Sequence, residues 1–431
     1  MIAVADQPAP LVTAASRPDA MATKPVARAA PPVALYVHVP FCVSLCPYCD
    51  FVVYAGSAAR GPKARVVAFL EALQVELDLR ADALDAAFGR ERPALETLYL
   101  GGGTPSLIPP ELIGELVGRV QARYGLVDNA EVTVEANPGP DERGDLAAFR
   151  AAGITRLSLG AQSMSAAGLR QLGRRHRVVD VVTAVAEARA AGIGSVSLDL
   201  LYDAPDASLT DWIDTLEGAL ALAPDHLSLY ALTLDDPDAE GLTGPGGDHL
   251  PTTAGARRWR ARASPRQDED RAAAQYHYAV HRLAADGWHG YEISNWSRPA
   301  HESRHNLVYW DRRPYEAVGP GAHAFDGVTR RWNAARLEGY LAALTPSGGG
   351  AARLPPGGSE AIDPATGAAE AVILGLRTDR GVPLAAAHEP PLAGAFGWAL
   401  AAELLATTDD DRIVLTTRGR LLSNELFGRL V

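Results

Sequence analysis

Residues 39–51 read VPFCVSLCPYCDF and hold all three cysteines of the 431-residue chain, Cys42, Cys46 and Cys49. Three cysteines cannot all pair, so a disulfide framework does not explain them. Clustered free thiols are typical of a reducing compartment and indicate metal binding or redox chemistry. From the residues alone two sites are open: a zinc ion completed by His38, or a [4Fe–4S] cluster that three thiolates leave with one open iron. The alternation in LYVHV predicts that His38 points into the sheet instead.

From residue 34 to about 233, short apolar segments alternate with longer amphipathic stretches. This pattern predicts a parallel sheet with helical crossovers, either an open doubly wound sheet or a partial barrel. The expected strands are 34–39, 95–100, 131–136, 156–161, 195–201 and 226–232, with helices at 64–84, 110–124, 178–192 and 211–223. Unusual residues lie at or just beyond the C-terminal ends of successive strands, namely Cys42, Gly101–Gly103, Glu135, Gln162 and Asp199. A barrel collects such positions at one mouth, so we predict an α/β fold built on a partial (β/α)6 barrel.

The composition is that of an acidic globular protein. It is 47% hydrophobic with a net charge of −12, so a nucleic-acid-binding protein is not expected. No apolar run approaches the roughly 18–20 residues of a membrane span. Residues 1–33 are rich in Ala and Pro and lack the apolar core of a secretory signal. We predict a disordered tail there and a cytoplasmic protein.

The remaining chain divides by composition. The barrel is expected over 34–233, followed by a loop or insertion over 234–268 that is rich in Pro, Gly, Asp and Arg. Residues 269–344, beginning with a helix at about 269–286, are expected to pack on the barrel. Residues 345–431 are expected to form a small α+β, winged-helix-like domain, with Thr416 or Thr417 capping its last helical segment. The acidic charge of the chain favours a packing role for this domain over DNA binding.

The cysteine stretch is similar to the signature of the radical S-adenosylmethionine (SAM) superfamily, both in its C-x3-C-x2-C spacing and in its aromatic-flanked PYCDF. In that superfamily, a segment like LYLGGGTPSL (98–107) contacts the methionine amino group of SAM. Its glycines bring bare backbone close to a ligand, and it matches neither G-x-G-x-x-G nor a P-loop. Four polar residues add a carboxylate for a ribose hydroxyl, an amide donor and a cation for the SAM carboxylate: Glu135, Gln162, Arg174 and Asp199. Each alone could be an ordinary polar residue.

Residues 304–310, RHNLVYW, contain the last candidate site. A histidine among aromatic residues is often a hydrogen-bonded core residue. An imidazole is also a heme axial ligand, and Tyr309 and Trp310 could stack on the macrocycle. Both interpretations of His305 stay open from the residues alone.

Eight motifs occur in the order seen in the HemW family of radical-SAM heme chaperones: YVHVPFCVSLCPYCDF, GGGTPS, VEANPG, LGAQS, LGRRH, LDLLY, PDHLSLYALT and HNLVYW. The chain resembles that family from about residue 33 to its end. The resemblance implies a [4Fe–4S] cluster on the three cysteines and heme at the HNxxYW motif, with His305 as the axial candidate. It also implies SAM contacts by Tyr36, Tyr48, Gly102, Gly103, Thr104, Glu135, Gln162, Arg174 and Asp199.

The function expected from this resemblance is to bind heme and transfer it to acceptor hemoproteins, with an electron donor such as flavodoxin or ferredoxin as a further partner. The alternative is the related oxygen-independent coproporphyrinogen III oxidase. That enzyme has a C-x-x-C-x-C pattern, whose last cysteine is replaced here by Phe51. We therefore expect a radical SAM fold without this oxidase activity. A barrel protein with a structural zinc is a third interpretation.

Overall fold

The computed structural model describes residues 28–59, 61, 64–234, 237–346, 350–389 and 392–430. Most of the predicted tail, residues 1–27, lies outside this part of the chain. The following residues run along the barrel, where the Ala30 amide donates to Asp326 O (2.8 Å) and the Val33 amide donates to Pro314 O (3.0 Å). Within the described residues, no helix is long and apolar enough to cross a membrane.

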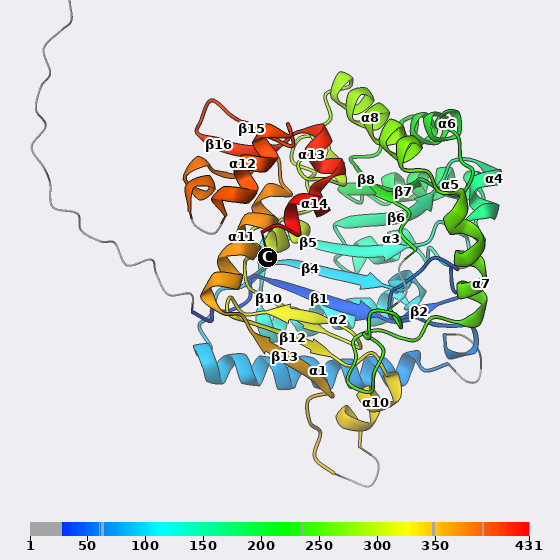
Figure 1. Ribbon diagram of the computed structural model, residues 1–431. Coiled ribbons are helices and arrows are strands. Elements are labelled where there is room, and N and C mark those ends of the chain that lie inside the picture. Colours follow the sequence, from blue (N-terminus) through cyan, green and yellow to red (C-terminus); the bar gives the residue numbers. More distant parts are fainter. Residues whose placement is uncertain are drawn as a thin grey trace, which may run out of the picture.

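A large mixed sheet forms the body of the protein (Figure 1). Its centre consists of the six predicted strands, parallel and in chain order: β1 (Ala34–Val39), β4 (Leu95–Gly102), β5 (Leu126–Ala136), β6 (Arg156–Gln162), β7 (Ser195–Tyr202) and β8 (His226–Ala231). The helices between them are α1 (Val66–Phe88), α2 (Pro110–Tyr124), α3 (Leu146–Ala151), α4 (Ala166–Gln171), α5 (Val178–Ala190) and α6 (Leu209–Leu220). This order confirms the predicted partial barrel. Two short strands, β2 (Phe41–Cys42) and β3 (Tyr54–Ala55), pair beside the end of β1.

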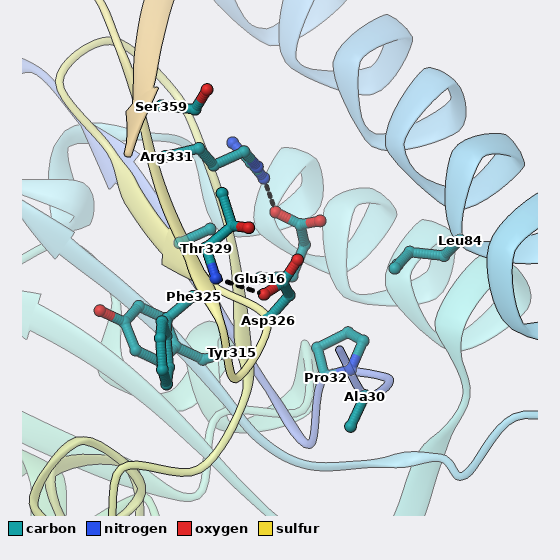
Figure 2. A pocket seen from close by; sticks show the side chains of 11 residues that line it. Ala30, Pro32, Leu84, Tyr315, Glu316, Phe325, Asp326, Thr329, Arg331 and Ser359 are labelled. Atoms are coloured by element: carbon teal, nitrogen blue, oxygen red, sulfur yellow. Dashed lines mark hydrogen bonds and ion pairs between the residues drawn. The ribbon is translucent and has the colours of Figure 1, made fainter. Parts of the chain in front are cut away.

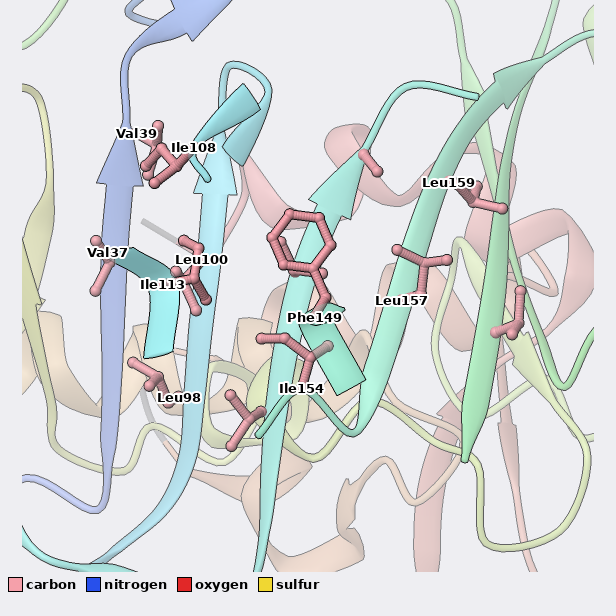
Figure 3. Packing of buried hydrophobic residues seen from close by; sticks show 14 of the residues in the cluster. Val37, Val39, Leu98, Leu100, Ile108, Ile113, Phe149, Ile154, Leu157 and Leu159 are labelled. Carbon is pink, nitrogen blue, oxygen red and sulfur yellow. The ribbon is translucent and has the colours of Figure 1, made fainter. Parts of the chain in front are cut away.

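The central strands alternate between apolar and polar residues, although strands of parallel sheets are usually apolar throughout. One set of side chains, including Val37, Leu98 and Leu157, packs against Ile113 of α2 and Phe149 of α3 (Figure 3). The residues between them project from the opposite face because successive side chains of a strand alternate. One face of the sheet therefore builds the core under the helices. The other face carries polar groups into the barrel interior.

Five strands that the sequence did not predict extend the sheet at its two edges. β10 (Tyr315–Val318) pairs in parallel with β1, on the side away from β4. It is followed by three antiparallel strands, β11 (His323–Phe325), β12 (Thr329–Asn333) and β13 (Gly357–Ala361), and β9 (Asn295–Ser297) pairs with β8 at the other edge. These strands are only three to five residues long. Such short segments, with arginine and glycine in β12 and β13, carry too little apolar alternation to be recognised.

Glu76 of α1 fastens this extension to the barrel. Its side chain is fully buried, and it accepts hydrogen bonds from the Gly319 amide (2.9 Å), Asn333 Nδ2 (2.8 Å) and Tyr340 OH (2.8 Å). Arg80, one turn further along α1, pairs with the same carboxylate at 3.3 Å. Buried carboxylates require such a set of donors. The carboxylate thus joins α1, the end of β12 and α10 (Leu337–Leu344).

The segment 234–268, predicted as a loop or insertion, contains a helix that the sequence did not predict. α7 (Ala254–Ala263) begins at Thr253, whose side chain accepts a hydrogen bond from the Ala256 amide. Its sequence AGARRWRARA has one large apolar residue, Trp259, so no apolar helical periodicity can be recognised in it. Two further helices follow, α8 (Glu269–Ala285) and α9 (Arg304–Trp310).

The C-terminal region has a hydrophobic cluster of its own, which includes Phe396 and Ile413. Its elements are α11 (Pro364–Leu376), β14 (Val382–Pro383), α12 (Ala393–Ala401), β15 (Leu405–Thr407), β16 (Arg412–Leu415), α13 (Thr417–Leu421) and α14 (Ser423–Phe427). β15 and β16 form an antiparallel ribbon that leads into α13. Thr416 caps that helix by accepting a hydrogen bond from the Gly419 amide at 3.0 Å. A small α+β region with this cap agrees with the sequence.

Candidate functional site

The cysteine loop follows β1, at the end of the barrel where the parallel strands terminate. Cys42 Sγ lies 3.2 Å from Thr104 Oγ1, and Cys46 Sγ accepts a hydrogen bond from Arg174 Nη1 at 3.1 Å. All three thiols are free and partly buried. Burial raises the pKa of Cys42 to about 12. A thiolate at this position therefore needs the positive charge of a bound metal.

This donor set fits an iron–sulfur cluster better than a single metal ion. Among the described residues, no three His, Cys, Asp or Glu side chains could hold one ion together. A zinc ion requires ligands that converge, whereas a cubane distributes its ligands over separate irons. His38 is not available as a fourth ligand: its Nδ1 lies 3.0 Å from Tyr36 OH and its Nε2 lies 2.9 Å from Val52 O. His38 is buried, as the alternation in LYVHV predicts.

The glycine turn after β4 lies directly against the start of the cysteine loop. Gly102 has a φ of +106°, and a Cβ at this residue would lie 2.4 Å from His38 Cε1. A Cβ on Gly103 would lie 2.6 Å from Phe41 O. Neither position can take a side chain without displacing its neighbours. The glycines thus allow β4 and the cysteine loop to approach closely.

Two predicted carboxylates, Glu135 and Asp199, lie on the inner face near the ends of β5 and β7. Glu135 accepts hydrogen bonds from Tyr99 OH and from the Gly102 amide, each at 2.8 Å. Asp199 accepts one from Ser158 Oγ at 3.0 Å. Burial raises the pKa of both carboxyl groups, and that of Glu135 to about 7. Each carboxyl group retains acceptor capacity for the hydroxyl groups of a ligand.

Gln162 and Arg174 complete the polar mouth, by which we mean the polar side chains at the strand ends that also include Thr104, Glu135 and Asp199. Gln162 ends β6 with a φ of 65°, a strained conformation that is concentrated at functional sites. Arg174 Nη2 donates to Gly160 O at 3.0 Å. Its Nε is buried without a hydrogen-bond partner in the described part of the chain. Such an unpaired donor is a group that an anionic ligand would satisfy.

The sequence analysis missed two residues that position this site. Asn137 donates from Nδ2 to Thr104 Oγ1 at 3.0 Å and accepts from Arg174. Its position two residues after Glu135, in VEANPG, was a signal that could have revealed it. Arg260 of α7 donates from Nη2 to the carbonyls of Tyr48 (3.2 Å) and Cys49 (3.0 Å). No motif marks Arg260, because its role depends on how α7 packs over the cysteine loop.

His305 of α9 lies in the barrel interior, away from solvent. Only 1% of its surface is exposed, and its ring stacks on Tyr99 with centroids 5.0 Å apart. Nδ1 lies 2.7 Å from Thr97 Oγ1, and Nε2 lies 2.8 Å from Tyr309 OH. Burial lowers the pKa of His305 to about 3. This geometry favours the structural interpretation, since an axial-ligand role would require one of the two hydrogen bonds to break.

A cavity lies at the other end of the barrel, between α1 and strands β10 to β12 (Figure 2). Its lining includes Leu84, Phe325 and the ion pair of Glu316 with Arg331. No cysteine or histidine lines it. Tyr315 begins β10 and also lines the cavity. Its ring packs edge-on against that of Tyr309, with the ring centroids 4.6 Å apart. The cavity is therefore separate from the polar mouth.

Known proteins resemble this chain in sequence and in fold. A sequence profile described as the radical SAM superfamily matches residues 36–217. The heme chaperone HemW of Mycobacterium tuberculosis is 38% identical over 93% of this chain and 95% of its own length. The heme chaperone HemW of Bacillus subtilis is 31% identical over 91% and 97%. This chain belongs to the HemW family.

A solved structure shares the fold of this HemW-family chain. The solved structure of the radical SAM enzyme coproporphyrinogen III oxidase (HemN) from Escherichia coli matches with a TM-score of 0.74. The alignment covers 93% of this chain and 90% of that chain, at 21% sequence identity. At this identity the match shows a shared fold. Membership of the radical SAM superfamily implies a [4Fe–4S] cluster and SAM, for which the mouth of this HemW-family barrel provides thiols, carboxylates and an unpaired cationic donor.

Proposed function

We propose that this protein is a heme chaperone, which binds heme and transfers it to acceptor hemoproteins. The observation that carries the proposal is its 38% identity over 95% of the length of a relative named as a heme chaperone. The motifs found in the sequence extend over the same length of chain. An electron donor such as flavodoxin or ferredoxin is a proposed further partner, because a cluster of this kind must be reduced to act.

We propose that Cys42, Cys46 and Cys49 hold the [4Fe–4S] cluster. The cluster would supply one open iron, to which the amino and carboxylate groups of SAM can bind. Arg174 would pair with the SAM carboxylate; in support, its buried Nε has no hydrogen-bond partner among the described residues and its Nη1 contacts Cys46. The proposed SAM-binding residues are Tyr36, Tyr48, Gly102, Gly103, Thr104, Glu135, Gln162, Arg174 and Asp199.

The oxidase alternative is disfavoured by Phe51. The residue stands where the oxidase pattern has a cysteine, and 62% of its surface is exposed. An exposed phenyl ring offers neither a thiol nor a proton donor next to the cluster. It offers an apolar surface, which suits contact with a partner or with a porphyrin.

The test is an anaerobic titration of heme into cluster-loaded protein, followed by transfer to an apo-hemoprotein. We expect heme binding seen as a Soret band, transfer of that band to the acceptor, and no conversion of coproporphyrinogen. A Cys46→Ala variant should lose the cluster iron. SAM-dependent decarboxylation of coproporphyrinogen by the wild type would overturn the proposal, and so would a failure to bind heme.

A further inference from the structure

The helix that covers the cysteine loop carries exposed arginines that no site described so far uses. Arg258 and Arg262 of α7 are both exposed, and neither forms an ion pair or a hydrogen bond within the ranges that the structure describes. The adjacent Arg257, by contrast, pairs with Asp238. Residues four apart on a helix lie on the same face. α7 therefore presents two positive charges to solvent without a carboxylate to neutralise them.

The opposite face of α7 is fixed on the cysteine loop. Arg260 is 6% exposed, and it donates to the backbone carbonyls of residues 47–49 at 3.0–3.3 Å. The ring of Trp259 lies beside that of Tyr48, with centroids 6.3 Å apart. Residue 49 is one of the three cysteines. The charged face of α7 thus belongs to a helix that contacts the proposed cluster loop directly.

A second pair of arginines flanks the same loop from α4. Arg170 and Arg175 are exposed, and they form no ion pair in the part of the chain that the structure describes. Between them in the chain, Gly173 packs against the loop, since a Cβ at this residue would lie 3.0 Å from Pro47 Cδ. The loop therefore lies between two segments that each carry two arginines without ion pairs.

These two segments form one surface at the mouth end of the barrel (Figure 1). Leu172, Tyr48 and Trp259 belong to a single small apolar cluster, which joins the end of α4 to the loop and to α7. Two apolar side chains of the loop are exposed, Leu45 by 36% and Phe51 by 62%. We call the four arginines on this surface the arginine patch: Arg170, Arg175, Arg258 and Arg262.

Acidic residues near the arginine patch do not cancel its charge. The cysteine loop contributes Asp50, which is exposed. Asp206 lies near the end of α7, where it pairs with Arg266 at 3.4 Å. The four arginines of the patch therefore give this surface a positive charge, in a chain whose net charge is −12.

We propose that the arginine patch is the docking surface for a small acidic protein that delivers one electron to the cluster. The inference rests on the proposed function, in which Cys42, Cys46 and Cys49 hold a [4Fe–4S] cluster. One electron would pass from the reduced carrier to the oxidised cluster, which changes from the 2+ to the 1+ state. The carrier loses that electron, and no covalent bond forms or breaks.

Charge complementarity identifies the partner. An acidic protein is repelled by a chain of net charge −12, so a local positive patch selects where it can approach. Opposite charges also steer association and increase its rate by roughly 10- to 1,000-fold. Electron-transfer complexes are small and short-lived, and arginine is enriched in protein interfaces. Leu45 and Phe51 would supply the apolar contact between the charged groups.

The test is stopped-flow reduction of the cluster-loaded, full-length protein by an acidic flavodoxin in its anionic hydroquinone form. The flavin gives up one electron and becomes the neutral semiquinone, which is followed by absorbance. Arg258→Glu/Arg262→Glu should lower the second-order rate constant at low salt by roughly tenfold or more. The difference should nearly vanish at about 1 M salt, where the screening length is about 3 Å. Arg258→Lys/Arg262→Lys retains the charge and should react like the wild type.

The matched control is Arg353→Glu/Arg418→Glu, which changes the net charge equally at exposed positions outside the arginine patch. Its rate constant should stay within about twofold of the wild-type value. Photoreduced deazaflavin, a small reductant that needs no docking surface, should reduce the cluster equally in every variant. Cluster iron content should also be equal.

Equal loss of rate in the patch variant and the control variant would overturn the docking assignment, as would no loss in either. So would a patch variant that is reduced at the wild-type rate but no longer binds phosphatidylglycerol vesicles, or that transfers heme more slowly to its acceptor. A wild type without a cluster that deazaflavin can reduce would overturn the proposed cluster site, and this inference with it. The two failures are thereby distinguishable.

Discussion

Replacing His305 by alanine tests whether this ring is part of the core or a heme ligand. The change would leave Thr97 Oγ1 and Tyr309 OH without their present partner, at a cost of about 1 kcal/mol each. It would also leave a cavity next to Tyr99, which costs about 2–3 kcal/mol for a large-to-small substitution. The free energy of unfolding should fall by roughly 4–5 kcal/mol. His305→Gln keeps one polar group, so its free energy of unfolding should fall by about half as much.

The loss of stability in His305→Ala should be local as well as global. Tyr99 stacks on His305 and donates to Glu135, so the loss of the ring loosens a residue of the polar mouth. Urea denaturation gives the change in unfolding free energy, and hydrogen exchange of peptides from α9 and β4 shows where protection is lost. His301→Ala, at a partly exposed site, should change the free energy by less than about 0.5 kcal/mol. The reasoning is refuted if His305→Ala loses less than about 1 kcal/mol while the Soret band of bound heme shifts.

Three further predictions follow from the packing. Gly102→Ala should weaken SAM binding by about 1–3 kcal/mol, because the backbone φ of +106° is unfavourable for alanine and the added Cβ would clash with His38. Calorimetry measures the binding. As a control, Gly118→Ala should bind SAM normally, because a Cβ there would meet nothing within 4 Å. Glu76→Ala should lower the unfolding free energy by about 3–5 kcal/mol, and a loss no larger than that of the exposed Glu71→Ala would contradict this. Burial lowers the pKa of His38 to about 4 and that of His305 to about 3, so the unfolded chain takes up protons below about pH 6.5 that the folded chain does not. The stability present above that pH should therefore fall by about 2 kcal/mol per ring between pH 7 and 5, and a melting temperature independent of pH in this range would exclude the effect.

The central barrel could be predicted from the sequence because each of its strands is bounded by glycine or proline and followed by an amphipathic helix. The site residues could be predicted in part for the same reason. Glu135 and Asp199 lie near the ends of recognisable strands, and the ends of parallel strands meet at one mouth. The role of Arg260 could not be predicted, because it depends on how the segment after β8 folds back over the cysteine loop. His305 shows a different limit, since one motif is compatible with both a ligand and a buried core residue.

Because β1 pairs with β10, which lies almost 280 residues later in the chain, the barrel edge beside the cysteine loop can be completed only late in synthesis. The cysteine loop is made before the rest of the barrel, yet some of the groups that pack around it come much later in the chain. Tyr54 OH, for example, donates to Ala335 O across 281 residues of chain. At about 5–20 residues per second, synthesis of that interval takes roughly 15–60 s. During this time the three thiols have no completed barrel around them and are open to oxidation. The complete site proposed for the cluster can therefore form only after this interval has been made, and we expect reducing conditions during synthesis to protect the thiols until then.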